Sequence, residues 1–157
     1  MAAVTAAMVK ELREVSGAGM MECKKALTET DGNLDAAIEF LRKNGQAKVE
    51  KKANRIAAEG LTAVGIIDDH TAAVVEVNSE TDFVAKNPEF IEFVETLAVK
   101  ALEQECGDID SFMTVGFGEN GTVGEALTEK ISKIGENMNI RRFAKFVTPG
   151  VVYTGYI

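Results

Sequence analysis

The stretch Thr-Ala-Ala-Val-Val-Glu-Val-Asn-Ser at residues 71–79 decides the fold, because the sequence pattern changes there from a helical to an extended period. Val75 and Val77 alternate with Glu76 and Asn78, which is typical of a strand with one buried face. The stretch therefore predicts a half-buried β-strand.

A second run rich in Val and Ile precedes this strand at residues 61–67, and Asp68-Asp69-His70 separates the two runs. A short polar turn between two such runs is typical of a β-hairpin. We therefore expect the strands 61–67 and 71–78 to pair in an antiparallel sheet.

The pattern before residue 60 is helical. Thr5 is a candidate N-cap for a first helix to about Val15, and a second helix is expected over residues 20–30. A third is expected over residues 34–43, where Asn44-Gly45 has the composition of a helix end. A polar segment rich in Ala and Lys then predicts a connecting helix up to Gly60.

The sequence after the hairpin mixes helical and extended patterns. Asn87-Pro88 predicts the start of a long apolar helix that fades by Gly107. Residues 108–121 are expected to form a loop, and Thr122 with Glu125 predicts a capping box for a helix to about Lys133. A third strand is expected at 140–147 and an extended stretch at 151–157.

These elements predict an α+β protein. Its expected parts are a three-helix domain at residues 1–45, a connecting helix at 46–60 and a small antiparallel sheet packed with helices at 61–157.

The chain of 157 residues carries a formal charge of −8, which argues against nucleic-acid binding through general phosphate attraction. The first 55 residues nevertheless hold ten Lys and Arg against eight Asp and Glu. Their basic excess lies at Lys48, Lys51, Lys52 and Arg55. This cluster is either a solvated helix face or a docking surface for an acidic partner.

We expect neither a membrane-spanning protein nor a secreted one. No apolar run approaches the roughly 18 residues that a membrane span needs. The N-terminus lacks the features of a signal peptide, and Cys23 and Cys106 are too few for a disulfide scaffold. We therefore expect a cytoplasmic protein with free thiols and no membrane partner.

The sequence offers little for catalysis, and neither a cofactor nor a metal is expected. His70 is the single histidine, and Asp68-Asp69-His70 fits a turn better than a metal site. The glycines of 116–121 match a dinucleotide-binding spacing, but a good preceding strand is missing, so a flexible loop is the favoured interpretation over a cofactor enzyme.

Two apolar features leave alternatives open. Met20-Met21 either fills the core of the three helices or forms an adaptable binding surface. Phe83 follows a polar stretch and has no periodic partner. It either folds back onto the sheet or projects as an anchor for a partner protein.

Three segments resemble the elongation factor Ts family. They are Val-Lys-Glu-Leu-Arg at 9–13 with the Gly-Ala-Gly-Met-Met segment at 17–27, Glu-Val-Asn-Ser-Glu-Thr-Asp-Phe-Val-Ala at 76–85, and Ile-Gly-Glu-Asn-Met-Asn-Ile-Arg-Arg-Phe at 134–143. Their order is that of the family, and together they span nearly the whole chain.

The resemblance implies a guanine-nucleotide exchange factor that promotes GDP release from elongation factor Tu, with no catalytic residues of its own. It implies a ubiquitin-associated-like fold for the three helices. The segment that it implies to insert beside the partner's Mg²⁺ and phosphate site is Thr81, Asp82, Phe83 and Val84. The contacts that it implies for the N-terminal module are Arg13, Met20 and Met21.

The chain ends about where the family core would continue into a second subdomain, so the region 61–157 is expected to be a truncated core. The alternative to an exchange factor is a ubiquitin-associated-like peptide-binding module on an α+β scaffold without exchange activity.

Overall fold

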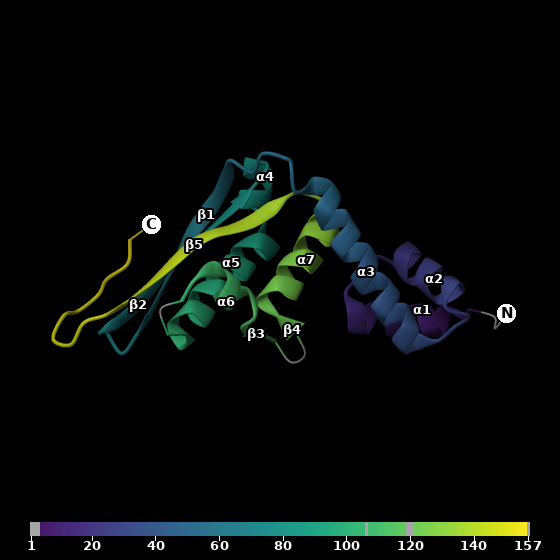
Figure 1. Cartoon of the computed structure of the whole chain (residues 1–157), viewed down its shortest axis with the longest axis horizontal. Helices are drawn as coiled ribbons and strands as arrows, with labels where there is room; N and C mark the ends of the chain where they lie inside the picture. Colours follow the sequence, from purple (N-terminus) through teal and green to yellow (C-terminus); the bar gives the residue numbers. More distant parts are fainter. Residues whose placement is uncertain (1–3, 106, 119–120, 157) are drawn as a thin grey trace.

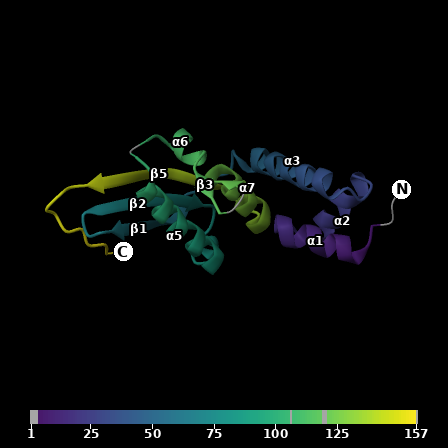
Figure 2. The ribbon, with the colours of Figure 1, turned by 90° about the horizontal axis from the view of Figure 1, so that it is seen from below.

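A computed structural model of the chain describes residues 4–105, 107–118 and 121–156. Three helices occupy one end of the molecule, a three-stranded sheet occupies the other end, and α7 (Val123–Ile134) lies between them (Figures 1 and 2). The α+β class predicted from the sequence is confirmed.

The N-terminal module consists of α1 (Ala6–Ser16), α2 (Met20–Glu29) and α3 (Leu34–Lys52). The Thr5 and Asn33 side chains cap α1 and α3 by accepting hydrogen bonds from backbone N–H groups. The three helices share their own cluster of buried side chains, which is Val9, Leu12, Cys23, Ala26, Leu27 and Ala37. Helices this short are stable only through such packing.

The expected helix end at Asn44-Gly45 is wrong, because α3 continues through Gly45 to Lys52. The expected connecting helix is therefore the second half of α3, and residues 53–58 are not helical. A Cβ at position 45 would lie 3.3 Å from Ser132 Oγ and 3.5 Å from Thr128 Cγ2 of α7. Gly45 therefore permits close packing against α7, and this packing overrides its weak helix propensity.

The sheet has the order β1 (Glu59–Ile67), β2 (Thr71–Ser79), β5 (Met138–Val147), and all its pairs are antiparallel. The predicted hairpin is confirmed, and Asp68 and Asp69 at its tip adopt left-handed φ angles of 51° and 60°. The third strand begins two residues earlier than expected. A bulge between Glu76 and Val77 shifts the pairing of β2 with β5.

One face of the sheet packs on the long helix α5 (Pro88–Glu103), which Asn87 caps and Pro88 begins as predicted. The principal core lies between this face and the helices α5, α6 (Ile109–Met113) and α7. It includes Val75, Val77, Phe90, Leu97, Phe112, Ile131 and Ile140. Figure 1 shows α5 and α6 on this side of the strands.

The loop expected at residues 108–121 is in part ordered structure. It contains α6 and the short strands β3 (Gly116–Phe117) and β4 (Gly121–Thr122). The Asp108 side chain accepts a hydrogen bond from Ser111 N and so caps the start of α6. The predicted capping box of Thr122 and Glu125 is present at the start of α7.

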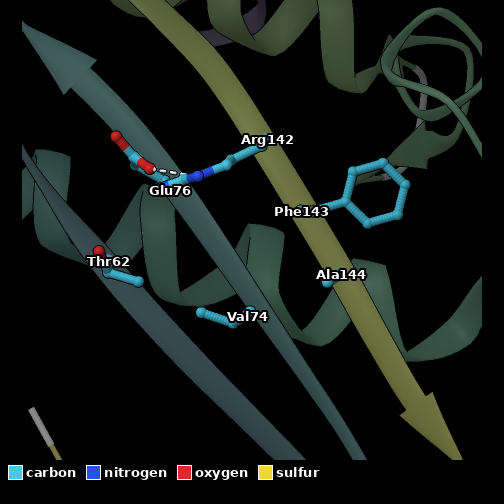
Figure 3. Close-up of a pocket in the computed structure, with 6 residues that line it drawn as sticks. All are labelled: Thr62, Val74, Glu76, Arg142, Phe143 and Ala144. Carbon is cyan, nitrogen blue, oxygen red and sulfur yellow. Dashed lines mark hydrogen bonds and ion pairs between the residues drawn. The ribbon is translucent and has the colours of Figure 1, made fainter.

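The opposite face of the sheet is more open. A hollow of about 320 Å³ on the sheet is lined in part by Thr62, Val74 and Ala144, and Arg142 there donates a 2.6 Å hydrogen bond to Glu76 (Figure 3). This hydrogen bond lowers the pKa of Glu76.

The chain after β5 turns back beside the hairpin. Tyr153 N donates to Asp69 O, and a Cβ at Gly155 would lie 3.1 Å from Val64 Cγ1. Residues 151–156 belong to no strand or helix, and Ile157 lies outside the described residues. Across the described ranges, no helix is long and apolar enough to cross a membrane.

Gly60 is required by both its backbone angle and its surroundings. Its φ is +139°, and a Cβ there would lie 2.1 Å from Val77 O. We expect Gly60→Ala to reduce the free energy of unfolding by about 2–4 kcal/mol, since strain and a backbone clash act together. Thermal unfolding followed by circular dichroism measures the change. Gly116→Ala is the control, because nothing lies within 4 Å of a Cβ at that position; equal losses of stability in the two variants would contradict this account.

The Glu89 carboxylate joins α5 to α7. It accepts hydrogen bonds from Lys130 Nζ at 2.7 Å and from Lys133 Nζ at 2.8 Å, and these bonds lower its pKa, with Lys130 contributing most. A carboxyl whose pKa is lowered by folding stabilises the protein above its unfolded pKa, and the stabilisation is lost as the pH falls through the folded value.

We therefore expect Glu89→Gln to reduce stability by about 1 kcal/mol at pH 7, since the pair is partly exposed. The difference from wild type should shrink as the pH falls below about 4.3, the ordinary Glu pKa. Urea unfolding at several pH values measures it, with the exposed Glu92→Gln as control. A difference that stays constant down to pH 3 would refute the assignment.

Candidate functional site

The predicted insertion segment forms a single helical turn at the end of β2. Its helix, α4 (Asp82–Ala85), begins at Thr81, whose Oγ1 accepts a hydrogen bond from Val84 N at 3.4 Å. The buried Ser79 donates from Oγ to Thr81 O at 3.1 Å. The polar residues that follow the strand therefore cap a short helix and orient the two apolar residues inside it.

Phe83 and Val84 lie on different sides of this turn. Val84 is 7% exposed and belongs to the core cluster, whereas Phe83 is 82% exposed. Consecutive residues of a helix point about 100° apart, so burial of Val84 directs Phe83 away from the core. Of the two interpretations of Phe83, folding back onto the sheet is wrong, and projection into solvent is confirmed.

Asp82 lies beside Phe83 and is also exposed. Lys86 Nζ donates a 2.7 Å hydrogen bond to Asp82 Oδ2, and this bond, together with the charge of Lys86, lowers the pKa of Asp82. Asp82 is therefore ionised at neutral pH. Phe83 therefore follows, along the chain, a carboxylate that is paired with Lys86.

The Glu136 carboxylate, which precedes β5, holds the segment before α4. Its Oε2 accepts hydrogen bonds from Glu80 N and Thr81 N, each at 3.1 Å. Its Oε1 accepts from Thr81 Oγ1 at 2.6 Å. Hydrogen bonds to an ionised acceptor are stronger than neutral ones, so this carboxylate fixes the backbone that leads into α4.

The Glu80 carboxylate makes the reciprocal contact. It accepts a hydrogen bond from Asn137 N at 2.5 Å and forms an ion pair with Arg55 at 3.5 Å. The Asn137 side chain in turn donates to Arg55 O at 2.8 Å. We call these contacts of Arg55, Glu80, Thr81, Glu136 and Asn137 the carboxylate exchange, since each strand end supplies an acid to the backbone of the other.

Glu80 and Glu136 lie within the family segments at 76–85 and 134–143, where no local sequence pattern indicates a role for either. Ser79 pairs with Met138 in the β2–β5 register, so the residues just beyond these two strand ends are neighbours. The signal that could have found them is an acid next to each end of two paired strands. It becomes informative only when the pairing of Ser79 with Met138, 59 positions further along the chain, is known.

The residues predicted in the N-terminal module lie at the α1–α2 turn and are exposed there. Met20 is 60% and Met21 75% exposed, so the interpretation that one or both of them fill the three-helix core is wrong. Arg13 and Met20 line a groove of about 1170 Å³ between this module and α7. The structure does not bring these residues to Phe83, so the two predicted contact regions are separate.

The other candidate sites have simpler roles. Asp68, Asp69 and His70 form the hairpin tip, where His70 Nδ1 lies 2.6 Å from Val151 O. Among the residues that the structure describes, no three His, Cys, Asp or Glu side chains gather as a metal site. Glu119 and Asn120 of the glycine motif lie outside the described residues, as does Cys106, and Cys23 is buried with a free thiol.

Comparison with known proteins points to the same family that the three sequence segments resemble. The model of the family described as Elongation factor TS matches residues 80–157, a range that contains α4 and Glu136. Curated relatives named Elongation factor Ts include those of Clostridium novyi (strain NT), 52% identical over 98% of this chain and 51% of the relative, and of Clostridioides difficile (strain 630), 54% identical over 100% and 52%. That of Xanthobacter autotrophicus is 53% identical over 100% of this chain and 51% of the relative.

The chain thus spans about half the length of the curated relatives that it matches. The identity extends over the N-terminal module as well as the sheet region, since at least 98% of the chain is aligned in each of these three. The chain belongs to the elongation factor Ts family.

Proposed function

We propose that this chain promotes the release of GDP from elongation factor Tu during translation elongation. The observation that carries the proposal is the exposed ring of Phe83 on a firmly held turn, within the segment that the family model matches. A few large side chains that fill pockets of the partner carry most of the binding energy of a protein interface.

In the proposed mechanism, Phe83 enters the partner beside its Mg²⁺ and phosphate site. The GTPase holds its nucleotide largely through phosphate contacts and the metal ion. A ring inserted next to that site displaces the groups that support the ion, and the ionised Asp82 adds a competing charge nearby. GDP and the exchange factor then weaken each other's binding, and this coupling is reciprocal.

The mechanism involves no covalent step, so we propose that the chain acts as a binding protein and not as an enzyme. It needs neither a general base nor a bound cofactor on this chain. The proposed role places the protein in the cytoplasm with the translation apparatus.

We further propose that the N-terminal module has a ubiquitin-associated-like fold and contacts the GTPase domain through Arg13, Met20 and Met21. Its separate buried cluster and the exposed pair of methionines support a binding role. The same observations favour the alternative in which the module binds a protein or peptide while the sheet region is a scaffold without exchange activity.

The proposal predicts that Phe83→Ala slows the release of GDP. Loss of an aromatic anchor at an interface is worth about 2 kcal/mol, which corresponds to a roughly 30-fold smaller acceleration. Release of a fluorescent GDP from elongation factor Tu, followed by stopped-flow, measures the rate with each variant.

Val99→Ala is the matched control, because Val99 is an apolar residue that is 52% exposed on α5. Equal acceleration by wild type and Phe83→Ala would remove Phe83 from the mechanism. Binding of wild type to elongation factor Tu without any acceleration would favour the binding-module alternative.

The carboxylate exchange also predicts an effect on nucleotide release when Glu136, which is less exposed than Phe83, is substituted. Glu136→Ala leaves two backbone N–H groups and the Thr81 hydroxyl without their acceptor. We expect stability to fall by about 1–3 kcal/mol and exchange to slow, since the backbone that leads into α4 is released.

Two variants separate positioning from general stability. Glu136→Gln retains a carbonyl oxygen that can accept from both backbone N–H groups, so it should restore most of the exchange rate. Glu89→Gln loses a carboxylate that joins other elements and should leave the exchange rate unchanged at temperatures where it is folded. If Glu136→Ala exchanges as fast as wild type, the positioning role is excluded.

A further inference from the structure

Ile56 is a large apolar side chain that lies almost fully in solvent. It lies in the segment 53–58 between α3 and β1, and it is 84% exposed. Among the large hydrophobic residues that the structure describes, only Tyr156 is more exposed, and Phe83 at 82% comes next. The two most exposed apolar side chains before the C-terminal segment are therefore Ile56 and Phe83.

The backbone that presents Ile56 is held on both sides of the adjacent Arg55. Arg55 N donates to Lys52 O at 2.8 Å, and Arg55 O accepts from Asn137 Nδ2 at 2.8 Å. The Arg55 guanidinium pairs with Glu80 Oε1 at 3.5 Å. Ile56 is thus fixed by the same carboxylate exchange that fixes the turn bearing Phe83.

These contacts place the two side chains at the same end of the sheet region. Glu80 is three residues before Phe83, and it touches the residue before Ile56. Figure 1 shows the connection from α3 to β1 at the end of the sheet where α4 lies, and α4 packs against β1. Charged groups near the two side chains form ion pairs within the chain, Arg55 with Glu80 and Lys86 with Asp82.

We propose that Ile56 is a second apolar anchor, which contacts the same GTPase as Phe83 and is buried in the same docking event. The inference rests on the proposed function and adds to it a residue outside the segment 81–84. The surface around Ile56 is continuous with the surface around Phe83. A partner that covers Phe83 therefore also reaches Ile56, which the same hydrogen bonds hold nearby. Burial of both removes from water the two most exposed apolar groups of this end.

Affinity for nucleotide-free elongation factor Tu tests the proposal, measured by titration calorimetry with the full chain. Ile56→Ala should weaken binding about five- to tenfold, a typical loss for an aliphatic anchor. Its melting temperature should equal that of wild type, because the side chain makes no core contact. Ile56→Leu, which keeps the apolar volume, should bind within about twofold of wild type.

Val99→Ala again serves as the control for loss of an exposed aliphatic group. The double variant Ile56→Ala with Phe83→Ala should lose the product of the two single losses if the side chains occupy separate subsites, and less if they share one. Either result supports a joint interface.

The two proposals fail in different ways. Wild-type affinity for Ile56→Ala, alongside a loss for Phe83→Ala, would overturn the second anchor and leave the proposed function intact. Absence of any binding by wild type would overturn both.

Discussion

The end of β2 and the start of β5 each supply a carboxylate to the backbone of the other, and the presentation of Phe83 depends on that contact. Glu136 accepts three hydrogen bonds from residues 80 and 81. Glu80 accepts a hydrogen bond from Asn137 N and forms an ion pair with Arg55. Ionised acceptors make these hydrogen bonds strong, and their geometry follows from the antiparallel register. The orientation of α4 is therefore a property of the sheet pairing as much as of its own four residues.

Packing between the two parts of the molecule decides a feature that local propensity misjudges. Asn44-Gly45 has the composition of a helix end, yet α3 passes through it. The missing side chain of Gly45 lets α7 approach with Thr128 and Ser132. The free energy gained from this contact outweighs the roughly 1 kcal/mol by which glycine disfavours a helix interior.

Local signals predicted the elements whose determinants are close together in the chain. The hairpin, the Asn87-Pro88 helix start and the Thr122–Glu125 capping box each depend on residues within a few positions. The site was different: the residues themselves left the orientation of Phe83 open, and the role proposed for it came from the resemblance to a family. Whether Phe83 or Val84 is buried depends in part on Glu136, which lies 55 positions from Thr81, and no local pattern carries that information.

The continuity of α3 gives the molecule a fixed spacer. Nineteen residues of α-helix at 1.5 Å per residue make a rod of roughly 28 Å, which begins in the N-terminal module and ends beside the residues that hold α4. A flexible tether would let Met20 and Phe83 search independently and would lose entropy when both bind. A rod sets their separation in advance, so any single protein that engages both must offer two receptive surfaces at a matching interval, and the second engagement then follows the first at high effective concentration.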